Sequence, residues 1–481
     1  MPARMPARRL SPLALALLGA SCASPRPATP APSTRARALV GATLVDGTGS
    51  APVPDAAVVI DADGRIACAG TRAACPVPEG AEATDLRGAW LTPGLVDAHV
   101  HFSQTAWADG RPDALDLRAQ HPYAQVEAGL RMHPERFFRA YVCSGVTAVF
   151  DVGGFPWTFE LPARAERDPL APHVAAAGPL LSTLDHWLNL PAERQFIYLR
   201  DEAAAREGVR YLAAEHAAAA KVWFIVGEGR PFAELSAVVG AAGDEARKAG
   251  LPVIVHATGL AEAKEALRAG ARLLVHSVED LPVDDEFLSL AKAHEALYCP
   301  TLTVRDGYVR MFHAALDGKP PAVDDPRGCV DPATRALVAE TATVGADRVD
   351  RKRLATREPR WEAEARTAKE NLPRVAAAGI PIVMGTDAGN PLTLHGPSVY
   401  AEMEAMQAAG LTPMQVIVAS TRNGADAMGR LADLGTIERG KIADLLVLAA
   451  DPTRDVAAFR SIRAVVRSGV LHPEAELRAA R

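Results

Sequence analysis

Apolar and polar positions follow two different periods along the chain. Between residues 93 and 430, short apolar runs typical of buried strands alternate with Ala-rich stretches whose apolar positions repeat at helical spacing. The clearest case is PVIVH at 252–256, then a helix over AEAKEALRAG, then RLLVH at 272–276. This strand–helix–strand order is typical of a parallel sheet.

Repetition of this unit predicts the fold class. Strands are predicted at 95–101, 146–151, 172–176, 221–226, 252–256, 272–276, 297–303 and 381–386. Eight strand–helix units predict an α/β fold, a (β/α)8 TIM barrel over residues 93–430. The polar, charged stretch 308–370 is expected to form a lid inserted between the seventh and eighth strands.

The segments on either side of the predicted barrel have a different pattern, with short β segments in place of alternating strands and helices. Residues 37–92 contain short β segments separated by turns such as Asp46-Gly47 and Asp63-Gly64, and residues 431–475 contain similar segments. Chain ends often lie close together in a compact fold. We therefore expect the two flanks to form one small, split β-sandwich domain.

The N-terminus predicts a targeting segment. Residues 1–21 combine a basic start with an apolar stretch from Leu10 to Ala20, as in a signal peptide. LLGASC is similar to a lipoprotein lipobox, although Gly19 stands where Leu is usual, and predicts lipidation of Cys22, with 22–36 as a Pro/Ala-rich tether. The expected location is the periplasm or the outer membrane as a lipoprotein, otherwise secreted. The alternative is an apolar extension on a cytosolic protein.

Composition narrows the function classes. The 481 residues carry 52 basic and 58 acidic side chains, a formal charge of -6, so no nucleic-acid partner is expected. A charged fraction of 23% excludes a disordered chain and a multi-span membrane protein. Of the six cysteines, Cys68 and Cys75 are close enough to bridge in an oxidising compartment. The alternative is five free thiols beside Cys22, with Cys143 and Cys299 in apolar runs. Homo-oligomer formation is compatible with these features.

Polar side chains that can bind metal fall at the ends of the predicted strands, where barrel enzymes place their active sites. These residues are His99, His101, Lys221, His256, His276 and Asp387. Singly, each histidine could be a hydrogen-bonded structural residue, and Lys221 could be a strand-edge lysine that reaches water. Polar groups in parallel strands are costly unless paired or ligated. Their joint occurrence predicts a site for a metal such as Zn²⁺ rather than Ca²⁺ or Mg²⁺.

These motifs resemble a known family. TPGLVDAHVH, the lysine of the fourth strand, the two later histidines and GTDAG are similar to the amidohydrolase superfamily, in its imidazolonepropionase-like and metal-dependent Xaa-Pro dipeptidase-like branch, over about residues 38–472. The resemblance implies two divalent ions, with Zn²⁺ expected. His99, His101 and Asp387 would hold one ion, and His256 and His276 the other. Lys221 would bridge them as a carbamate formed with CO2.

The same resemblance implies roles for further residues. Asp387 would take a proton from a metal-activated hydroxide as it attacks and pass it to the leaving amine. Asp97 would support the ligands or form a turn, and His395 would contact substrate, orient a ligand or cap a loop. His186 and Arg305 would line the pocket or be ordinary loop residues. Thr258 and Phe150 stand where dipeptidase-like relatives often have Tyr and Arg, which puts dipeptide specificity in doubt.

The sequence therefore predicts an exported, metallopeptidase-like binuclear amidohydrolase that cleaves an amide bond of a small peptide or N-acyl amino acid. The alternatives are hydrolysis of a cyclic amide, ester or lactone with the same metal centre, or a catalytically silent periplasmic binding protein. A deaminase is disfavoured by Lys221. Partners are a small-molecule or dipeptide substrate and a membrane reached through a lipid anchor.

Overall fold

The computed structural model describes residues 35–108, 114–185, 195–227 and 229–479. The predicted signal peptide, Cys22, most of the tether and His186 lie outside the described residues. Within the described ranges, no helix has both the length and the apolar character needed to cross a membrane.

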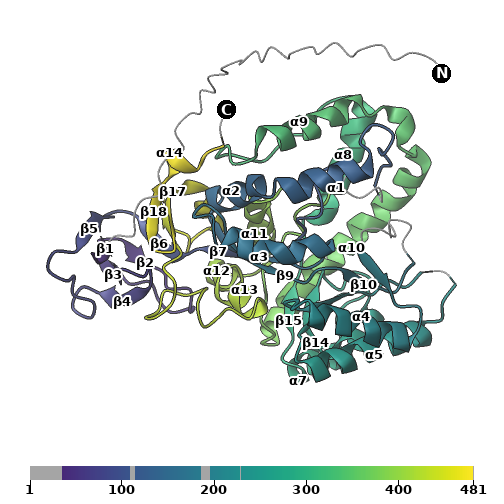
Figure 1. Ribbon diagram of the computed structural model, residues 1–481, viewed down its shortest axis with the longest axis horizontal. Coiled ribbons are helices and arrows are strands. Elements are labelled where there is room, and N and C mark those ends of the chain that lie inside the picture. The colour runs from purple at the N-terminus through teal and green to yellow at the C-terminus, as the bar shows by residue number, and fades with distance from the viewer. Residues whose placement is uncertain (1–34, 109–113, 186–194, 228, 480–481) are drawn as a thin grey trace, which may run out of the picture.

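The centre of the protein is a parallel barrel (Figure 1). Its strands are β7 (Leu95–Val100), β8 (Val146–Asp151), β9 (His173–Ala176), β10 (Leu180–Ser182), β12 (Ala220–Trp223), β13 (Val253–His256), β14 (Ala271–Val275) and β15 (Leu297–Cys299). The third predicted strand, 172–176, corresponds to β9, which pairs with β8. A further strand that was not predicted, β10, pairs with β12. An additional strand, β11 (Phe196–Tyr198), which the sequence analysis missed, pairs with β10.

The eighth predicted strand, 381–386, is not a regular strand. Single parallel bridges join Ile382 to Tyr298 of β15 and Ala388 to Val100 of β7, so this segment closes the ring between the seventh and first strands. The backbone leaves the extended region at Asp387, just after this segment, where φ is 61°. The fold class is confirmed, and the eighth strand is corrected to an irregular segment.

Helices surround the barrel. They are α1 (Tyr123–Met132), α2 (Glu135–Cys143), η1 (Pro156–Glu160), α3 (Leu161–Ala165), α4 (Glu202–Ala214), α5 (Phe232–Ala249), α6 (Leu260–Arg268), α7 (Asp285–Ala293), α11 (Ser398–Ala408), α12 (Pro413–Ala419) and α13 (Arg422–Ala427). Local sequence sets their ends: the Asp201 carboxylate accepts from the backbone N–H of Ala204 at the start of α4, and Gly250 ends α5 with φ of 67°.

Two antiparallel-rich sheets form the split domain, left in Figure 1. The first has the order β4 (Ile66–Thr71), β3 (Ala56–Ile60), β1 (Arg37–Val40), β5 (Glu82–Asp85); the second has the order β18 (Val470–Pro473), β17 (Ile462–Arg467), β16 (Leu445–Leu448), β6 (Trp90–Pro93), β2 (Thr43–Leu44). Because β16 pairs with both β6 and β17, segments from the two ends of the chain share one sheet. Leu39 and Val58 of the first sheet pack with Leu91 and Leu445 of the second, which makes the pair a sandwich.

The cysteines are mostly paired. Cys68 forms a disulfide with Cys75, and Cys143 forms one with Cys329, while Cys299 is free and buried. Of the two alternatives that the sequence left open, the Cys68–Cys75 bridge is confirmed. The alternative of five free thiols is wrong except for Cys299, because the fold brings Cys329 of the inserted segment against the end of α2.

The predicted lid is a helical insertion (upper right in Figure 1). Its elements are α8 (Val304–Asp317), α9 (Pro332–Glu340), η2 (Thr341–Thr343), η3 (Ala346–Arg348) and α10 (Arg351–Ala377). Met311, Val338 and Leu354 share an apolar cluster with Trp107 and Leu394, which lie in loops at the barrel's rim. The insertion therefore packs on the loops that surround the site.

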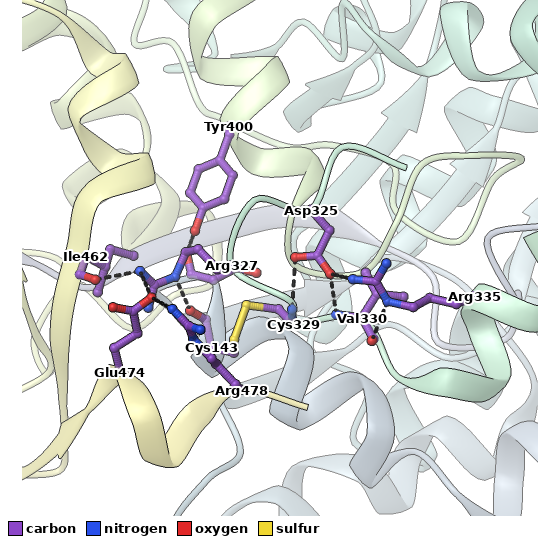
Figure 2. The surroundings of a disulfide bond; sticks show 11 residues. Cys143, Asp325, Arg327, Cys329, Val330, Arg335, Tyr400, Ile462, Glu474 and Arg478 are labelled. Atoms are coloured by element: carbon purple, nitrogen blue, oxygen red, sulfur yellow. Dashed lines mark hydrogen bonds and ion pairs between the residues drawn. A yellow bond between two sulfur atoms is a disulfide. The ribbon is translucent and has the colours of Figure 1, made fainter. Parts of the chain in front are cut away.

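One end of this insertion is tied to the rest of the fold (Figure 2). The Cys143–Cys329 disulfide joins it to α2. Beside that bond, Arg327 donates from Nε to the Cys143 carbonyl at 3.1 Å and from Nη1 to the Ile462 carbonyl at 2.5 Å, and it lies 3.5 Å from the Glu474 carboxylate. Ile462 begins β17, after η4 (Val456–Ser461), and Glu474 begins the C-terminal helix α14 (Glu474–Leu477). The segment around Arg327 thus links lid, barrel and split domain.

Candidate metal centre

Six side chains from five separate parts of the barrel line one cavity of about 290 Å³ at the carboxyl ends of the strands. They are His99 of β7, His101 just after β7, Lys221 of β12, His256 of β13, His276 just after β14, and Asp387 of the closing segment. Strand side chains alternate between faces, so His99 and His101 point the same way. The structure thus brings together all six side chains that the sequence singled out.

The distances define a compact cluster. Asp387 Oδ1 lies 3.2 Å from His99 Nε2 and 3.0 Å from His101 Nε2, and Asp387 Oδ2 lies 3.9 Å from His276 Nε2. The ligand atoms of His99, His276 and Asp387 all lie within 4.8 Å of one another. The ring centroids of His256 and His276 are 4.3 Å apart. Asp387 therefore stands between the His99/His101 pair and the His256/His276 pair.

Buried ring nitrogens indicate that this cluster fits a cation. His99 is 0% exposed, and neither Nδ1 nor Nε2 makes a hydrogen bond, although Asp387 lies near. Burial also holds the pKa of His99 well below its ordinary value and lowers the pKa of His276 to about 3. Both imidazoles are therefore neutral at pH 7 and offer lone pairs, the form that binds divalent metal.

Backbone and hydroxyl oxygens fix the orientation of two imidazoles. His101 Nδ1 lies 2.6 Å from the Gly153 carbonyl, and because a carbonyl can only accept, Nδ1 is the donor in this hydrogen bond, which leaves Nε2 directed at Asp387. His276 Nδ1 lies 2.6 Å from Thr301 Oγ1. Partners of this kind commonly hold metal-binding histidines in the right tautomer.

Asp97 hydrogen-bonds to the backbone beside two of the ligand candidates, His99 and Asp387. Its carboxylate accepts from the backbone N–H and the hydroxyl of Thr386, at 3.0 and 2.6 Å, and from the His99 N–H at 3.3 Å. Burial raises the pKa of Asp97 to about 7. By joining the residue before Asp387 to His99, Asp97 has the supporting position that the sequence suggested.

Charge at the centre is distributed between Asp387 and Lys221. Burial alone would raise the pKa of Asp387, but the nearby His99 and His101 hold it well below its ordinary value. Burial lowers the pKa of Lys221 to about 7. At neutral pH, Asp387 is therefore a carboxylate, and much of the Lys221 amine is uncharged and able to react with CO2.

The expectation of substrate contact is corrected for His395. It is 3% exposed and does not line the cavity; its ring stacks on Phe137 with centroids 3.9 Å apart, and its Nε2 lies 3.1 Å from the His101 carbonyl. The Phe102 ring also stacks on His395, with centroids 5.9 Å apart. His395 therefore contacts the backbone of a ligand candidate rather than the cavity. Of the two other roles considered for it, orienting a ligand and capping a loop, its contact with the His101 carbonyl fits the first.

Arg305 does line the cavity, as expected, and joins the lid to the rim. Its guanidinium pairs with Glu279, in the loop after β14, and with Glu364 of α10, at 2.9 Å for the latter. Arg305 also lies over the Trp361 ring, 5.8 Å from its centroid. The lid thus supplies part of the pocket wall through α8 and α10.

Several residues of the site escaped the sequence analysis. Thr301, which contacts His276, was placed inside the predicted strand 297–303, but β15 ends at Cys299. Trp361 and Tyr308 line the cavity from a segment whose polar composition indicated only a lid. Glu402 is a buried carboxylate on α11. A charge at a position where helical spacing places apolar residues was the available signal for Glu402.

A (β/α)8 barrel with imidazoles and a carboxylate gathered at the carboxyl ends of its strands defines a class, the barrel hydrolases that act on carbon–nitrogen bonds and generally use a divalent metal. Within that class, the chain belongs to the amidohydrolase family, whose model matches residues 90–471.

The chain is similar to individual proteins of known sequence or structure. Imidazolonepropionase of Caulobacter vibrioides (strain NA1000 / CB15N) is 28% identical over 414 residues, covering 84% of this chain and 90% of that protein. A crystal structure of a Xaa-Pro dipeptidase with bound methionine in its active site is 21% identical, with a TM-score of 0.65, covering 91% of this chain and 100% of that one. The structure of molinate hydrolase is 22% identical, with a TM-score of 0.67, covering 92% and 95%. The predicted membership of the amidohydrolase superfamily is confirmed, and the solved structures share its fold.

Proposed function

We propose that the protein is an exported binuclear metal hydrolase that cleaves an amide bond of a small peptide or an N-acyl amino acid. The observation that carries this proposal is the place of Lys221: its buried amine lines the same cavity as both histidine pairs and Asp387. A carbamate on that amine would provide two anionic oxygens where a protonated amine has no lone pair. His99, His101 and Asp387 would hold one ion, and His256 and His276 the other, with Zn²⁺ expected from the donor set.

The chain's own groups account for the remaining chemistry. Two bound divalent ions would supply an activated water and a polarised substrate carbonyl. Asp387 is ionised because its pKa is held low, so it can accept a proton from the attacking water and deliver it to the departing amine. The cavity of about 290 Å³ suits a small substrate.

A second candidate is hydrolysis of a cyclic amide, ester or lactone. It is favoured by the similarity to imidazolonepropionase over 84% of this chain, and by Thr258, which lines the cavity where a dipeptidase-like Tyr would stand. A silent binding protein is disfavoured because all six metal-ligand candidates are present and gathered.

Two disulfides favour export. Bonds such as Cys68–Cys75 and Cys143–Cys329 form and persist in oxidising compartments and are rare in the cytosol. Together with the signal-peptide pattern of residues 1–21 and Cys22, they support a periplasmic or lipid-anchored enzyme. Labelling of Cys22 by a fatty-acid analogue in the cell would test the anchor.

The activity is tested by measuring amine release from a library of dipeptides and N-acyl amino acids by the metal-loaded mature protein, with a chelator-treated sample as control. Chelator-sensitive release from a subset is expected. No release across the library, with two metals bound per chain, would contradict amide cleavage of this class and favour cyclic amides, esters or lactones.

A further inference from the structure

Glu402 is a carboxylate buried among apolar core residues. It is 0% exposed on α11, between the core residues Val399, Met403 and Met406 of the same helix. Burial raises its pKa to about 7, so keeping the side chain there costs folding free energy that an apolar residue would not cost. We therefore expect a contact of Glu402 that offsets this loss of folding free energy or serves the metal site.

Among the residues that the structure describes, Glu402 makes its hydrogen bonds to one loop, the one that follows β15. Oε1 accepts from the Leu302 N–H at 2.8 Å, and Oε2 accepts from the Thr303 N–H at 3.0 Å and from the Thr303 hydroxyl at 2.8 Å. Three donors converge on one carboxylate, so the backbone at 302–303 is fixed against α11.

Thr301, the residue just before Leu302 and Thr303, contacts the metal-ligand candidate His276. Thr301 has φ of 45°, a left-handed conformation that is unfavourable for a β-branched residue and persists only where the surroundings enforce it. In that conformation its Oγ1 lies 2.6 Å from His276 Nδ1. His276 itself has φ of 71°. Two strained residues therefore meet at the contact that directs His276 Nε2 toward the cavity.

Helix α11 is a firm support for this contact. Its Tyr400 hydroxyl donates to the Ser144 carbonyl at 3.1 Å, and its Glu404 pairs with Arg460 at 2.6 Å. The loop after β15 has only one further described tie to the His276 loop, from Ser277 Oγ to the Pro300 carbonyl at 3.2 Å. The carboxylate of Glu402 is thus the main restraint on the side of the loop that faces α11.

We propose that Glu402 is a positioning residue for His276: it fixes Leu302 and Thr303, keeps Thr301 in its strained conformation, and so holds His276 Nε2 in line to bind the second metal. This inference rests on the proposed function, because it requires that His276 holds a metal. The same hydrogen bonds also support the start of α8, which begins at Val304, so a merely structural role is the alternative to be separated.

The test compares metal binding in the full metal-loaded protein and in variants, by competition with a chelator and by the absorption spectrum of the cobalt-substituted protein. Glu402→Gln keeps the shape but places an amide donor against backbone donors. We expect one of the two ions to bind about 10–100-fold more weakly, with a changed cobalt spectrum, while the other ion keeps its affinity. Glu207→Gln, the same substitution at an exposed position of α4, is the control and should leave both affinities unchanged.

A second pair of variants covers the case that Glu402→Gln fails to fold. Thr301→Val keeps the branched side chain and its strain but lacks the hydroxyl that His276 needs, so it should weaken the same ion. Thr301→Ser keeps the hydroxyl and should bind both ions normally. Because Glu402 acts through Thr301, combining Glu402→Gln with Thr301→Val should weaken the ion no further than the stronger single variant does.

The outcomes separate this inference from the function. If the unaltered protein binds fewer than two ions, the proposed binuclear centre is wrong. If it binds two, and Glu402→Gln lowers only thermal stability with both affinities kept, Glu402 supports α8 alone and the inference is overturned. Additive losses in the double variant would overturn it as well.

Discussion

His395 reaches the back of the metal-ligand candidate His101: its Nε2 lies 3.1 Å from the His101 backbone carbonyl, and its ring stacks on Phe137. This places a loop residue behind β7 rather than in the cavity. The relationship predicts how His395 contributes, because a group that touches the backbone of a ligand affects metal binding and not substrate contact.

Replacing His395 by Phe should keep the aromatic stack and remove the hydrogen bond to His101. We expect the variant to fold and to lose metal faster under chelation, since partners of metal ligands commonly contribute 10–100-fold, about 1.4–2.7 kcal/mol, to metal affinity. The KM at saturating metal should stay near that of the unaltered protein. A large rise in KM with normal metal retention would show that His395 contacts substrate after all.

Replacing Lys221 by Ala should remove the bridge between the two histidine pairs. The expected result is a loss of metal and of amine release, with partial recovery when acetate or propionate is added, because a small carboxylate can occupy the space of a carbamate. Metal analysis and rate measurements on the same samples check this. Full metal content and full rate in Lys221→Ala would contradict the bridging role.

Carboxylation of Lys221 should depend on pH. An ordinary lysine has a pKa of 10.5 and is protonated at neutral pH, whereas burial lowers the pKa of Lys221 to about 7. Only the uncharged amine reacts with CO2, so labelled bicarbonate added to the metal-free protein should be incorporated increasingly as the pH rises through about 7. The carbamate signal can be followed by NMR. Incorporation that begins only near the ordinary lysine pKa would indicate an exposed, unperturbed amine.

The two disulfides should differ in their effect on stability. Cys143 and Cys329 are separated by 186 residues and Cys68 and Cys75 by 7; loop-closure entropy then gives about 5 and about 2.5 kcal/mol respectively. Replacing both cysteines of the long pair by Ser should therefore lower Tm more than the same change in the short pair.

That double replacement should also loosen the lid. Trp361 and Tyr308 of the lid line the cavity, so KM should rise, while the short-pair variant serves as a control with unchanged KM. Equal KM values for both variants would show that the tie at Cys329 does not affect the pocket.

The sequence predicted those parts of the site that regular elements position. His99, His101, His256 and His276 end or follow strands with strong apolar patterns, so their convergence followed from the barrel. The irregular conformation of the closing segment, the separate strand β10, and the Cys143–Cys329 bond were missed, because each depends on contacts between distant parts of the chain. Glu402 and Thr301 were missed because their roles come from backbone conformation, which a pattern of residue types does not encode.

The central claim is that six residues at one rim hold two metal ions. The most direct test is a crystal of the zinc-loaded protein measured at the zinc absorption edge. We predict two anomalous peaks, one beside His99, His101 and Asp387 and one beside His256 and His276, with density beyond the Lys221 amine that joins them. A single peak, or peaks away from these residues, would contradict the account.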